Sequence, residues 1–260
     1  MPRRYANPHD ARLVRWLIDA GLNNCQISRA TAIPLSTVQA WRKRSEAWPE
    51  DRRTLGRWAP CPRCDDRSMD EAGYAYLLGL YLGDGYIVHN RRGVYLLSIF
   101  LDKKYPLIVR SAAQAMSKVK GGRTPAAMRP QEGCFQVCLS WKHWPCLFPQ
   151  HGPGPKHTRQ IQLRDWQQTM VGRQTQELIR GLIHSDGSRF INRVHNGRNR
   201  SRRYEYPRYL FTNNSSDILG IFSNALDACG ISWRRSRWNA ISVARQSEVA
   251  KLDAFVGPKR

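Results

Sequence analysis

The feature that most constrains this 260-residue sequence is an internal duplication that runs from about residue 68 to the C-terminal end. Helical periodicity, alternating apolar stretches and turn signals predict the order helix, two strands, helix, two strands, helix. The same order is predicted a second time from about residue 174. The pattern therefore predicts an α+β body of two pseudo-symmetric αββαββα repeats.

The capping box Ser68-Met-Asp-Glu71 is predicted to begin the first helix of the first repeat. The first helix of each repeat carries small residues on one face. Gly79 and Gly83 are spaced i, i+4 in the first repeat, and Gly181 and Ser185 occupy the matching places in the second. Small residues at this spacing allow two helix backbones to approach closely. Glycine inside a helix costs about 1 kcal/mol relative to alanine, so we expect tight packing between these two helices to offset that cost.

Each of these helices is predicted to end in an aspartate followed by glycine, at Asp84 and at Asp186. A carboxylate at a helix C-terminus meets the negative end of the helix dipole, and the two would also repel each other if the helices pack side by side. A divalent cation, Mg²⁺ or Mn²⁺, removes both penalties, with the carboxylates or the backbone carbonyls of Gly83 and Ser185 as ligands. Paired metal-binding carboxylates are typical of phosphodiester hydrolysis. The simpler alternative is two Asp-Gly turns that only end helices.

Both segments resemble the LAGLIDADG motif of homing endonucleases: residues 77–85 read LLGLYLGDG and residues 179–187 read IRGLIHSDG. The resemblance covers roughly residues 70–256. It implies that the motif helices form the interface between the two repeats and that the sheets form a saddle over the DNA major groove. It also implies that Asp84 and Asp186 bind the catalytic metal ions.

The sequence departs from the motif at its first acidic position, which is Leu82 in one copy and His184 in the other. His184 either orients water or phosphate, or packs within the interface. The resemblance further implies basic or polar catalytic residues near the end of the fourth strand of each repeat. Lys142, Arg245 and Gln246 occupy those places, and the alternative for each is a solvated side chain at a strand end.

Basic residues gather on the predicted hairpins, interleaved with tyrosines in the second repeat. A charge run is often only a solvated face, but hairpins of a saddle would follow the DNA backbone. The predicted DNA contacts in the body are Arg91, Arg92, Arg189, Arg193, Arg198, Arg200, Arg202, Arg203 and Arg208.

Residues 1–46 are predicted to form a small all-α helix-turn-helix module, with helices over 10–20 and 24–32 and a third helix capped by Ser36. In such a module the last helix enters the major groove. An ordinary trihelical cap on the main domain is the alternative. The predicted DNA-reading side chains are Ser36, Thr37, Gln39, Arg42 and Lys43.

Residues 47–69 are predicted to be a linker, followed by repeat 1 (70–150), a connector (151–173) and repeat 2 (174–260). The linker contains Cys61 and Cys64 in a C-x-x-C pair, which suggests structural Zn²⁺ but supplies only two ligands of four. The side chains that could complete the site from a distance are His143, Cys146, His151 and His157.

The net charge indicates the partner. Lys and Arg number 42 against 20 acidic residues, a formal charge of +22, and such an excess favours an anionic partner, double-stranded DNA above all. The sequence has no bilayer-spanning apolar run and no secretory signal at its N-terminus, so we expect a cytoplasmic, nucleoid-associated protein.

Together these features predict a monomeric, metal-dependent, site-specific endonuclease that cuts double-stranded DNA, one strand per carboxylate. A transcriptional regulator that binds DNA on the same scaffold without cutting is the main alternative. A scaffold that binds protein or RNA, such as an intron-splicing maturase, is a third.

Overall fold

The computed structural model describes residues 8–43, 60–90, 93–122, 124–195, 203–257 and 259. The chain divides into two compact units, Met1–Pro60 and Cys61–Arg260. Within the described residues, no helix is long and apolar enough to cross a membrane.

The first unit is a bundle of α1 (Pro8–Asp19), α2 (Asn24–Thr31) and α3 (Leu35–Lys43). Its core consists of four buried side chains. Each helix supplies one of them, and the turn between α2 and α3 supplies the fourth: Val14, Ile27, Val38 and Ile33. Asn23 begins α2 with a capping box, because its side chain accepts from the Gln26 N–H while the Gln26 side chain accepts from the Asn23 N–H. The three predicted helices are therefore present.

The start of α3 differs from the prediction, which placed Ser36 at the cap. The helix begins at Leu35, two residues before the start that a Ser36 cap implies, and the Pro34 carbonyl accepts the first hydrogen bonds, from the N–H groups of Thr37 and Val38. Proline needs no N–H partner and has a fixed φ, so the chain enters the helix directly after it. Ser36 is an exposed residue of the first turn.

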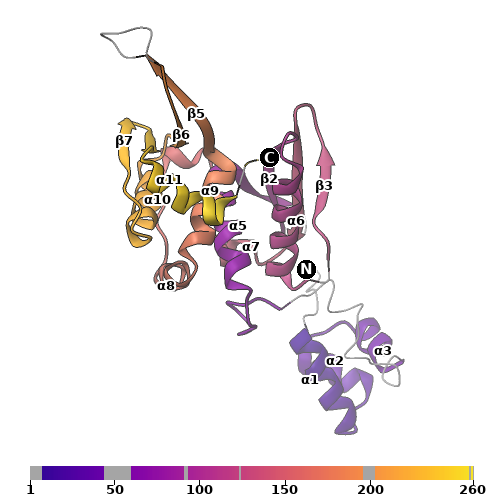
Figure 1. Ribbon diagram of the computed structural model, residues 1–260. Coiled ribbons are helices and arrows are strands. Elements are labelled where there is room, and N and C mark those ends of the chain that lie inside the picture. Colours follow the sequence, from indigo (N-terminus) through magenta and orange to yellow (C-terminus); the bar gives the residue numbers. More distant parts are fainter. Residues whose placement is uncertain are drawn as a thin grey trace. The chain divides into compact units, whose positions relative to one another are not determined.

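The second unit contains the duplicated αββαββα order (Figure 1). The first repeat comprises α5 (Glu71–Asp84), β1 (Gly85–Asn90), β2 (Val94–Asp102), α6 (Pro106–Lys120), β3 (Ala127–Pro130), β4 (Cys134–Trp141) and α7 (Trp144–Leu147). The second comprises α9 (Thr175–Asp186), β5 (Gly187–His195), β6 (Arg203–Thr212), α10 (Ser216–Ala228), β7 (Arg234–Arg237), β8 (Ala240–Val243) and α11 (Gln246–Val256). This confirms the predicted fold class.

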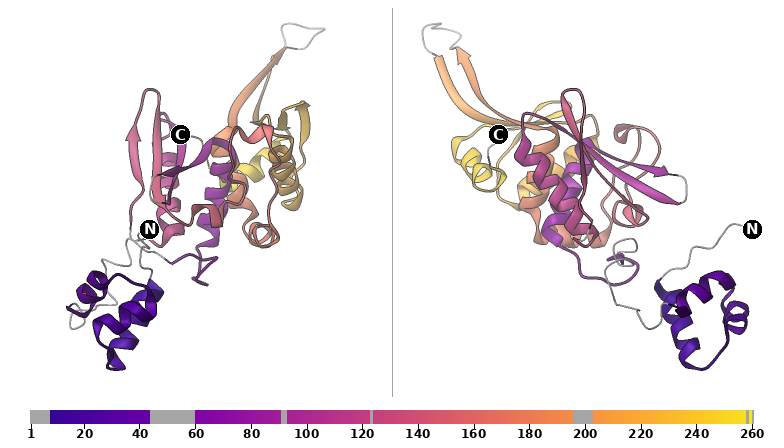
Figure 2. Two further views of the ribbon diagram at one scale, coloured as in Figure 1. Left: turned by 180° about the vertical axis from the view of Figure 1, so that it is seen from behind. Right: turned by 90° about the vertical axis from the view of Figure 1, so that its right-hand side faces the viewer.

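Each repeat forms one antiparallel four-stranded sheet, in the order β1-β2-β4-β3 and β5-β6-β8-β7. The two orders are equivalent, as expected for a duplication. Figure 1 shows the sheets on opposite sides of the α5–α9 pair, and Figure 2 shows the same arrangement from behind. Helix α6 covers the first sheet, and α10 and α11 lie with the second.

Helix α5 is the centre of this body. Its residues from Tyr74 to Leu82 are all buried, so it is apolar on every side rather than on one stripe. The reason is that it contacts α9, α6, α8 and the first sheet at once. Its N-cap is Asp70, whose side chain accepts from the Gly73 N–H, and not Ser68 as the sequence predicted.

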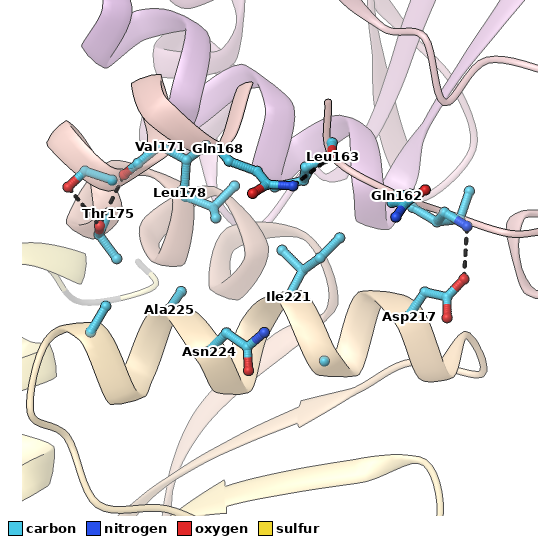
Figure 3. Close-up of a pocket in the computed structure, with 14 residues that line it drawn as sticks. Gln162, Leu163, Gln168, Val171, Thr175, Leu178, Asp217, Ile221, Asn224 and Ala225 are labelled. Atoms are coloured by element: carbon cyan, nitrogen blue, oxygen red, sulfur yellow. Dashed lines mark hydrogen bonds between the residues drawn. The ribbon is translucent and has the colours of Figure 1, made fainter. Parts of the chain in front are cut away.

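The connector between the repeats contains elements that periodicity did not predict: the 3₁₀ turn η2 (Lys156–Thr158) and helix α8 (Asp165–Arg173). Figure 3 shows how this segment lies against α10. The Ile161 N–H donates to Asp217 Oδ2 at 2.8 Å, and Thr175 Oγ1 donates to the Val171 carbonyl at 2.9 Å. The pocket between these helices is lined mostly by apolar and uncharged side chains, so it brings together no group of catalytic or metal-ligating residues.

Candidate active site

The backbones of α5 and α9 approach each other as closely as glycine allows; we call this contact the seam. A methyl group at Gly79 would lie 2.5 Å from the Leu178 carbonyl oxygen and 2.7 Å from the Leu182 nitrogen. Across the seam, a methyl group at Gly181 would lie 3.0 Å from the Gly79 Cα. Backbone therefore meets backbone here, and a side chain at either position would force the helices apart.

The seam ends at the two aspartates. A methyl group at Gly83, the residue before Asp84, would lie 2.5 Å from Ser185 Cβ and 3.0 Å from Asp186 Oδ2. The end of one motif helix therefore contacts the end of the other. Asp84 and Asp186 each stand as the last helical residue of their motif, as the sequence predicted.

The glycine after each aspartate is required by crowding and not by an unusual backbone angle. Gly85 and Gly187 are both extended, with φ of −95° and −91°. A methyl group would lie 2.5 Å from the Tyr81 Cα in the first case and 2.6 Å from the Ile183 Cα in the second. The chain thus passes directly from helix to strand, folded back over its own last turn.

The two carboxyl groups repel each other in a partly desolvated place. Burial, and then the negative charge of Asp186, raise the pKa of Asp84 to about 6. Burial also raises the pKa of Asp186, against the hydrogen bond that its Oδ2 accepts from Asn213 Nδ2 at 2.6 Å. Both groups are therefore harder to ionise than ordinary aspartates, which is the condition that a bound cation relieves.

Two lysines face this pair, one beside each helix end. Lys156 Nζ donates to the Gly83 carbonyl at 2.8 Å, and Lys259 Nζ donates to the Gly187 carbonyl at 2.6 Å and to the Ser185 carbonyl at 3.3 Å. Burial lowers the pKa of Lys156 to about 8 and also lowers that of Lys259, while the two aspartates act in the opposite direction on both.

Neither lysine was predicted from the sequence, because Lys156 lies in the short 3₁₀ turn η2 and Lys259 lies beyond the last helix. Their spacing is the signal that was available: Lys156 follows Asp84 by 72 residues, and Lys259 follows Asp186 by 73. The duplication therefore extends to the two ammonium groups. They hold the carbonyls of Gly83 and Ser185, which were predicted as metal ligands.

The register of the sheets corrects the three predicted catalytic residues at strand ends. Gly85 pairs with Ile99, which pairs with Val137, so Lys142 lies five residues further along and away from the helix end. At about 3.3 Å per residue, these five residues span about 16 Å. Lys142 instead follows β4 beside His143, on whose imidazole its charge acts.

The second repeat repeats this geometry. Gly187 pairs with Phe211 and Phe211 with Ile241, which places Arg245 and Gln246 beyond the far end of β8, where both side chains are exposed. Arg245 is the N-cap residue of α11 and Gln246 is its first helical residue. The prediction took the wrong end of the fourth strand in both repeats.

His184 is a packing residue of the seam. Its Nδ1 lies 2.9 Å from the Tyr76 hydroxyl and its Nε2 lies 3.1 Å from the Val256 carbonyl. Since a carbonyl only accepts, Nε2 carries the hydrogen and the hydroxyl donates to Nδ1. Burial lowers the pKa of His184 to about 4, so the ring is neutral near pH 7.

In the described part of the chain, each sheet has one face covered by helices and one face without helices, which we call its open face. The strand register determines which arginines lie on the open faces. Arg189 shares its face with Tyr209 and is bound by Asp253 of α11, with 2.7 Å for each of two hydrogen bonds, so it lies on the helix-covered side. Arg193 is on the same face and pairs with Glu205 at 3.1 Å. Each of these two guanidinium groups therefore has an acidic partner within the protein.

The open faces carry other basic residues. Arg208 lies on the open face of the second sheet and donates to Ser242 Oγ at 2.8 Å. Arg234 shares that face, because it pairs with Ser242, and it is exposed on the edge strand β7. In the first sheet, Arg129 of the edge strand β3 pairs with Gln136 and is exposed. Arg208 was among the DNA contacts predicted from the sequence, whereas Arg129 and Arg234 were not.

Several predicted contacts cannot be placed. Arg91, Arg92, Arg198, Arg200 and Arg202 lie outside the described residues, and for Arg203 only the backbone of β6 is described. In the first unit, the exposed side chains of Ser36, Gln39 and Lys43 share one face of α3 at i, i+3 and i+7. Thr37 is half-buried, and Arg42 Nε donates to Asn24 Oδ1 at 2.6 Å, which ties α3 to α2.

The body therefore consists of two αββαββα repeats that meet along the paired helices α5 and α9, each of which ends in an aspartate. No protein-family model and no curated protein matches the sequence.

Solved structures of homing endonucleases resemble this chain at low identity. Variants of the homing endonuclease I-DmoI align at a TM-score of 0.47 and 16% identity, over 72% of this chain and 96% of theirs. The LAGLIDADG meganuclease I-AabMI bound to uncleaved DNA aligns at 0.45 and 10%, over 70% and 82%. The LAGLIDADG homing endonuclease I-SmaMI bound to cleaved DNA aligns at 0.44 and 10%, over 71% and 83%.

Proposed function

We propose that this protein is a divalent-metal-dependent endonuclease that makes a staggered cut in double-stranded DNA at a specific site. The observation that carries the proposal is the paired arrangement at the end of the seam. Asp84 and Asp186 meet there across touching helix ends, with one lysine beside each. A structural role alone does not require two like charges at the place where they are most costly.

The donor set fits Mg²⁺ or Mn²⁺. Asp84 and Asp186 supply carboxylate oxygens in a partly desolvated setting, and the carbonyls of Gly83 and Ser185 are the adjacent neutral oxygens. Such cations, when bound, stabilise the attacking and leaving oxygens of a phosphodiester. Because the pKa of Asp84 is raised only to about 6, its carboxylate is available as a ligand near neutral pH.

Lys156 and Lys259 are the positively charged side chains beside the two aspartates. Each ammonium group is held at a helix end by carbonyl hydrogen bonds, so its position is fixed before any substrate arrives. A fixed cation beside a phosphate stabilises the extra negative charge of the transition state without having to reorganise. One lysine per carboxylate suits a reaction in which each half of the site cuts one strand.

The DNA-binding surface in this proposal consists of the open sheet faces, with Arg129, Arg208 and Arg234 among its cations. The formal charge of +22 supplies the non-specific attraction. Because both motifs belong to one chain, a monomer carries a complete site and its target need not be palindromic. The exposed face of α3 with Ser36, Gln39 and Lys43 would add contacts of the helix-turn-helix type.

The second candidate is a regulator that binds DNA without cutting, and the polar face of α3 is the observation that favours it. The retained pair of aspartates favours the nuclease. The two functions differ in one measurable respect, which is whether a divalent cation converts bound DNA into cut DNA.

The test is a cleavage reaction on a plasmid library that contains the genomic flanks of the gene. We expect linear product with Mg²⁺ or Mn²⁺ and intact plasmid with EDTA, and sequencing of the ends should give a single staggered site. Specific binding in a mobility-shift assay, with no linear product at any metal concentration, would support the regulator. Absence of both binding and cutting on every flank would contradict DNA recognition near this gene.

A further inference from the structure

Four metal-ligating side chains converge at the start of the second unit, away from the aspartate pair. Cys61 and Cys64 belong to the segment that precedes α5, while His143 precedes α7 and Cys146 lies within it. The three sulfur atoms and one imidazole nitrogen all lie within 4.8 Å of one another. His151 and His157, the other candidates from the sequence, are not part of this cluster.

We propose that Cys61, Cys64, His143 and Cys146 bind one structural Zn²⁺ ion. Three thiolates and one imidazole form a closed tetrahedral set of the kind found in structural zinc sites. Soft sulfur ligands select zinc over the hard cations that suit Asp84 and Asp186, so the two metal sites are chemically distinct. This proposal does not rest on the nuclease proposal.

The distances agree with a tetrahedron around one ion. Zinc–sulfur bonds of about 2.3 Å and zinc–nitrogen bonds of about 2.0 Å separate neighbouring ligand atoms by roughly 3.5–3.8 Å. Cys64 Sγ and Cys146 Sγ are 3.6 Å apart, and Cys146 Sγ lies 3.7 Å from His143 Nδ1. The widest pair needs to close by only about 1 Å, which a side-chain rotation supplies.

The loop that carries the first two ligands is already shaped for an ion. The Arg63 N–H points at Cys61 Sγ from 3.4 Å, and the Cys61 N–H donates to Asp65 Oδ2 at 2.7 Å. Hydrogen bonds to ligand sulfur atoms are a recurring feature of the surroundings of a metal. Cys61 itself is fully buried, while the ring of Trp141 lies against His143 with centroids 5.3 Å apart.

A disulfide is the competing explanation and fits the cluster less well. The sulfur–sulfur distance of 3.6 Å far exceeds the bond length of about 2.05 Å. A bridge between Cys64 and Cys146 would also leave Cys61 and His143 without a role, whereas one ion uses all four side chains. Zinc would join residues 82 positions apart and fix the segment leading into α5 to the end of the first sheet.

Elemental analysis of the full chain, purified without a histidine tag and without chelator, tests this proposal. We expect about one zinc per chain in the wild type and a loss of at least about tenfold in Cys64→Ser and His143→Ala. Cys229→Ser, which removes a half-buried thiol elsewhere, should keep its zinc. The double variant Asp84→Asn/Asp186→Asn should keep it as well, and His143→Cys should restore the binding that His143→Ala loses.

A second measurement does not depend on whether the variants fold. Replacing the ion by Co²⁺ in the wild type should give the visible spectrum of a tetrahedral cobalt site with thiolate ligands. A wild-type protein that contains no zinc and gives no such spectrum would overturn the proposal. Full zinc retention in folded Cys64→Ser, or a Cys64–Cys146 disulfide found by mass spectrometry in metal-free native protein, would overturn it as well.

Discussion

Replacing Asp84 or Asp186 by asparagine is expected to reduce the metal-dependent production of linear DNA by at least about 10³-fold. Asparagine keeps the shape of the side chain but loses the negative charge that holds the cation. DNA affinity should change little, because the cations of the open sheet faces are untouched. The measurement is the rate of linearisation, with the mobility shift of the same DNA as the control for binding.

The Asp84→Asn variant should also be more stable than the wild type when no divalent cation is present. Burial and Asp186 raise the pKa of Asp84 from about 3.9 in the unfolded chain to about 6, so the folded state favours the protonated form. The stability that this group contributes is present below about pH 4 and is lost as the pH rises through 6. We expect a gain of about 1–3 kcal/mol for the variant at pH 7.5 and a smaller gain at pH 5.

Denaturant unfolding in EDTA at the two pH values measures this difference. Asp66→Asn is a matched control, because Asp66 is an exposed residue at a φ of 49°, which asparagine also tolerates. It removes the same charge without relieving any buried repulsion, so its effect should be within about 0.5 kcal/mol. Equal effects of the two substitutions would mean that Asp84 and Asp186 do not oppose each other.

The second large effect is expected from Gly79→Ala, which should destabilise the protein by about 3 kcal/mol or more. The added methyl group would lie 2.5 Å from one backbone atom of α9 and 2.7 Å from another, and backbone atoms cannot rotate away. The helices would have to separate along the seam. For a domain of this size the midpoint of thermal unfolding should fall by roughly 6–12 °C.

Gly220→Ala is the control for the same chemical change. Gly220 lies inside α10, and an added methyl group there would have no heavy atom within 4 Å. Alanine should therefore stabilise that helix by about 0.5–1 kcal/mol. Thermal unfolding followed by circular dichroism compares the two variants. A Gly79→Ala protein as stable as Gly220→Ala would show that the seam is not closely packed.

The duplicated fold and the two aspartates could be predicted from the sequence because both are local patterns. Gly79 and Gly181 stand at matching places in two matching helices, and each helix ends in Asp-Gly. The cap residues were predicted less well. Ser36 and Ser68 have the right chemistry for a cap, but α3 starts directly after Pro34 and Asp70 is the N-cap of α5. Several residues near each helix start could precede its first turn, and only the three-dimensional structure selects one.

The two lysines of the candidate active site and the covered face of each sheet could not be predicted from sequence periodicity. Lys156 and Lys259 follow turns and loops, and in the sequence only their nearly equal spacing from the aspartates, 72 and 73 residues, connects them to the site. Alternation along β5 and β6 shows that Arg189 and Arg208 point to the opposite face from their sequence neighbours, but it does not show which face of the sheet is covered by helices. Asp253, 64 residues away in α11, decides that Arg189 is on the covered face.

The central claim is that Asp84 and Asp186 together form one site for hard divalent cations, and Mn²⁺ binding tests it most directly. The electron paramagnetic resonance signal of free Mn²⁺ falls when the ion binds, so a titration of the full chain counts bound ions without knowledge of the DNA target. We predict that the wild type binds Mn²⁺ and that Asp84→Asn/Asp186→Asn does not, while Asp66→Asn binds like the wild type. Equal Mn²⁺ binding by the wild type and the double variant would contradict the account.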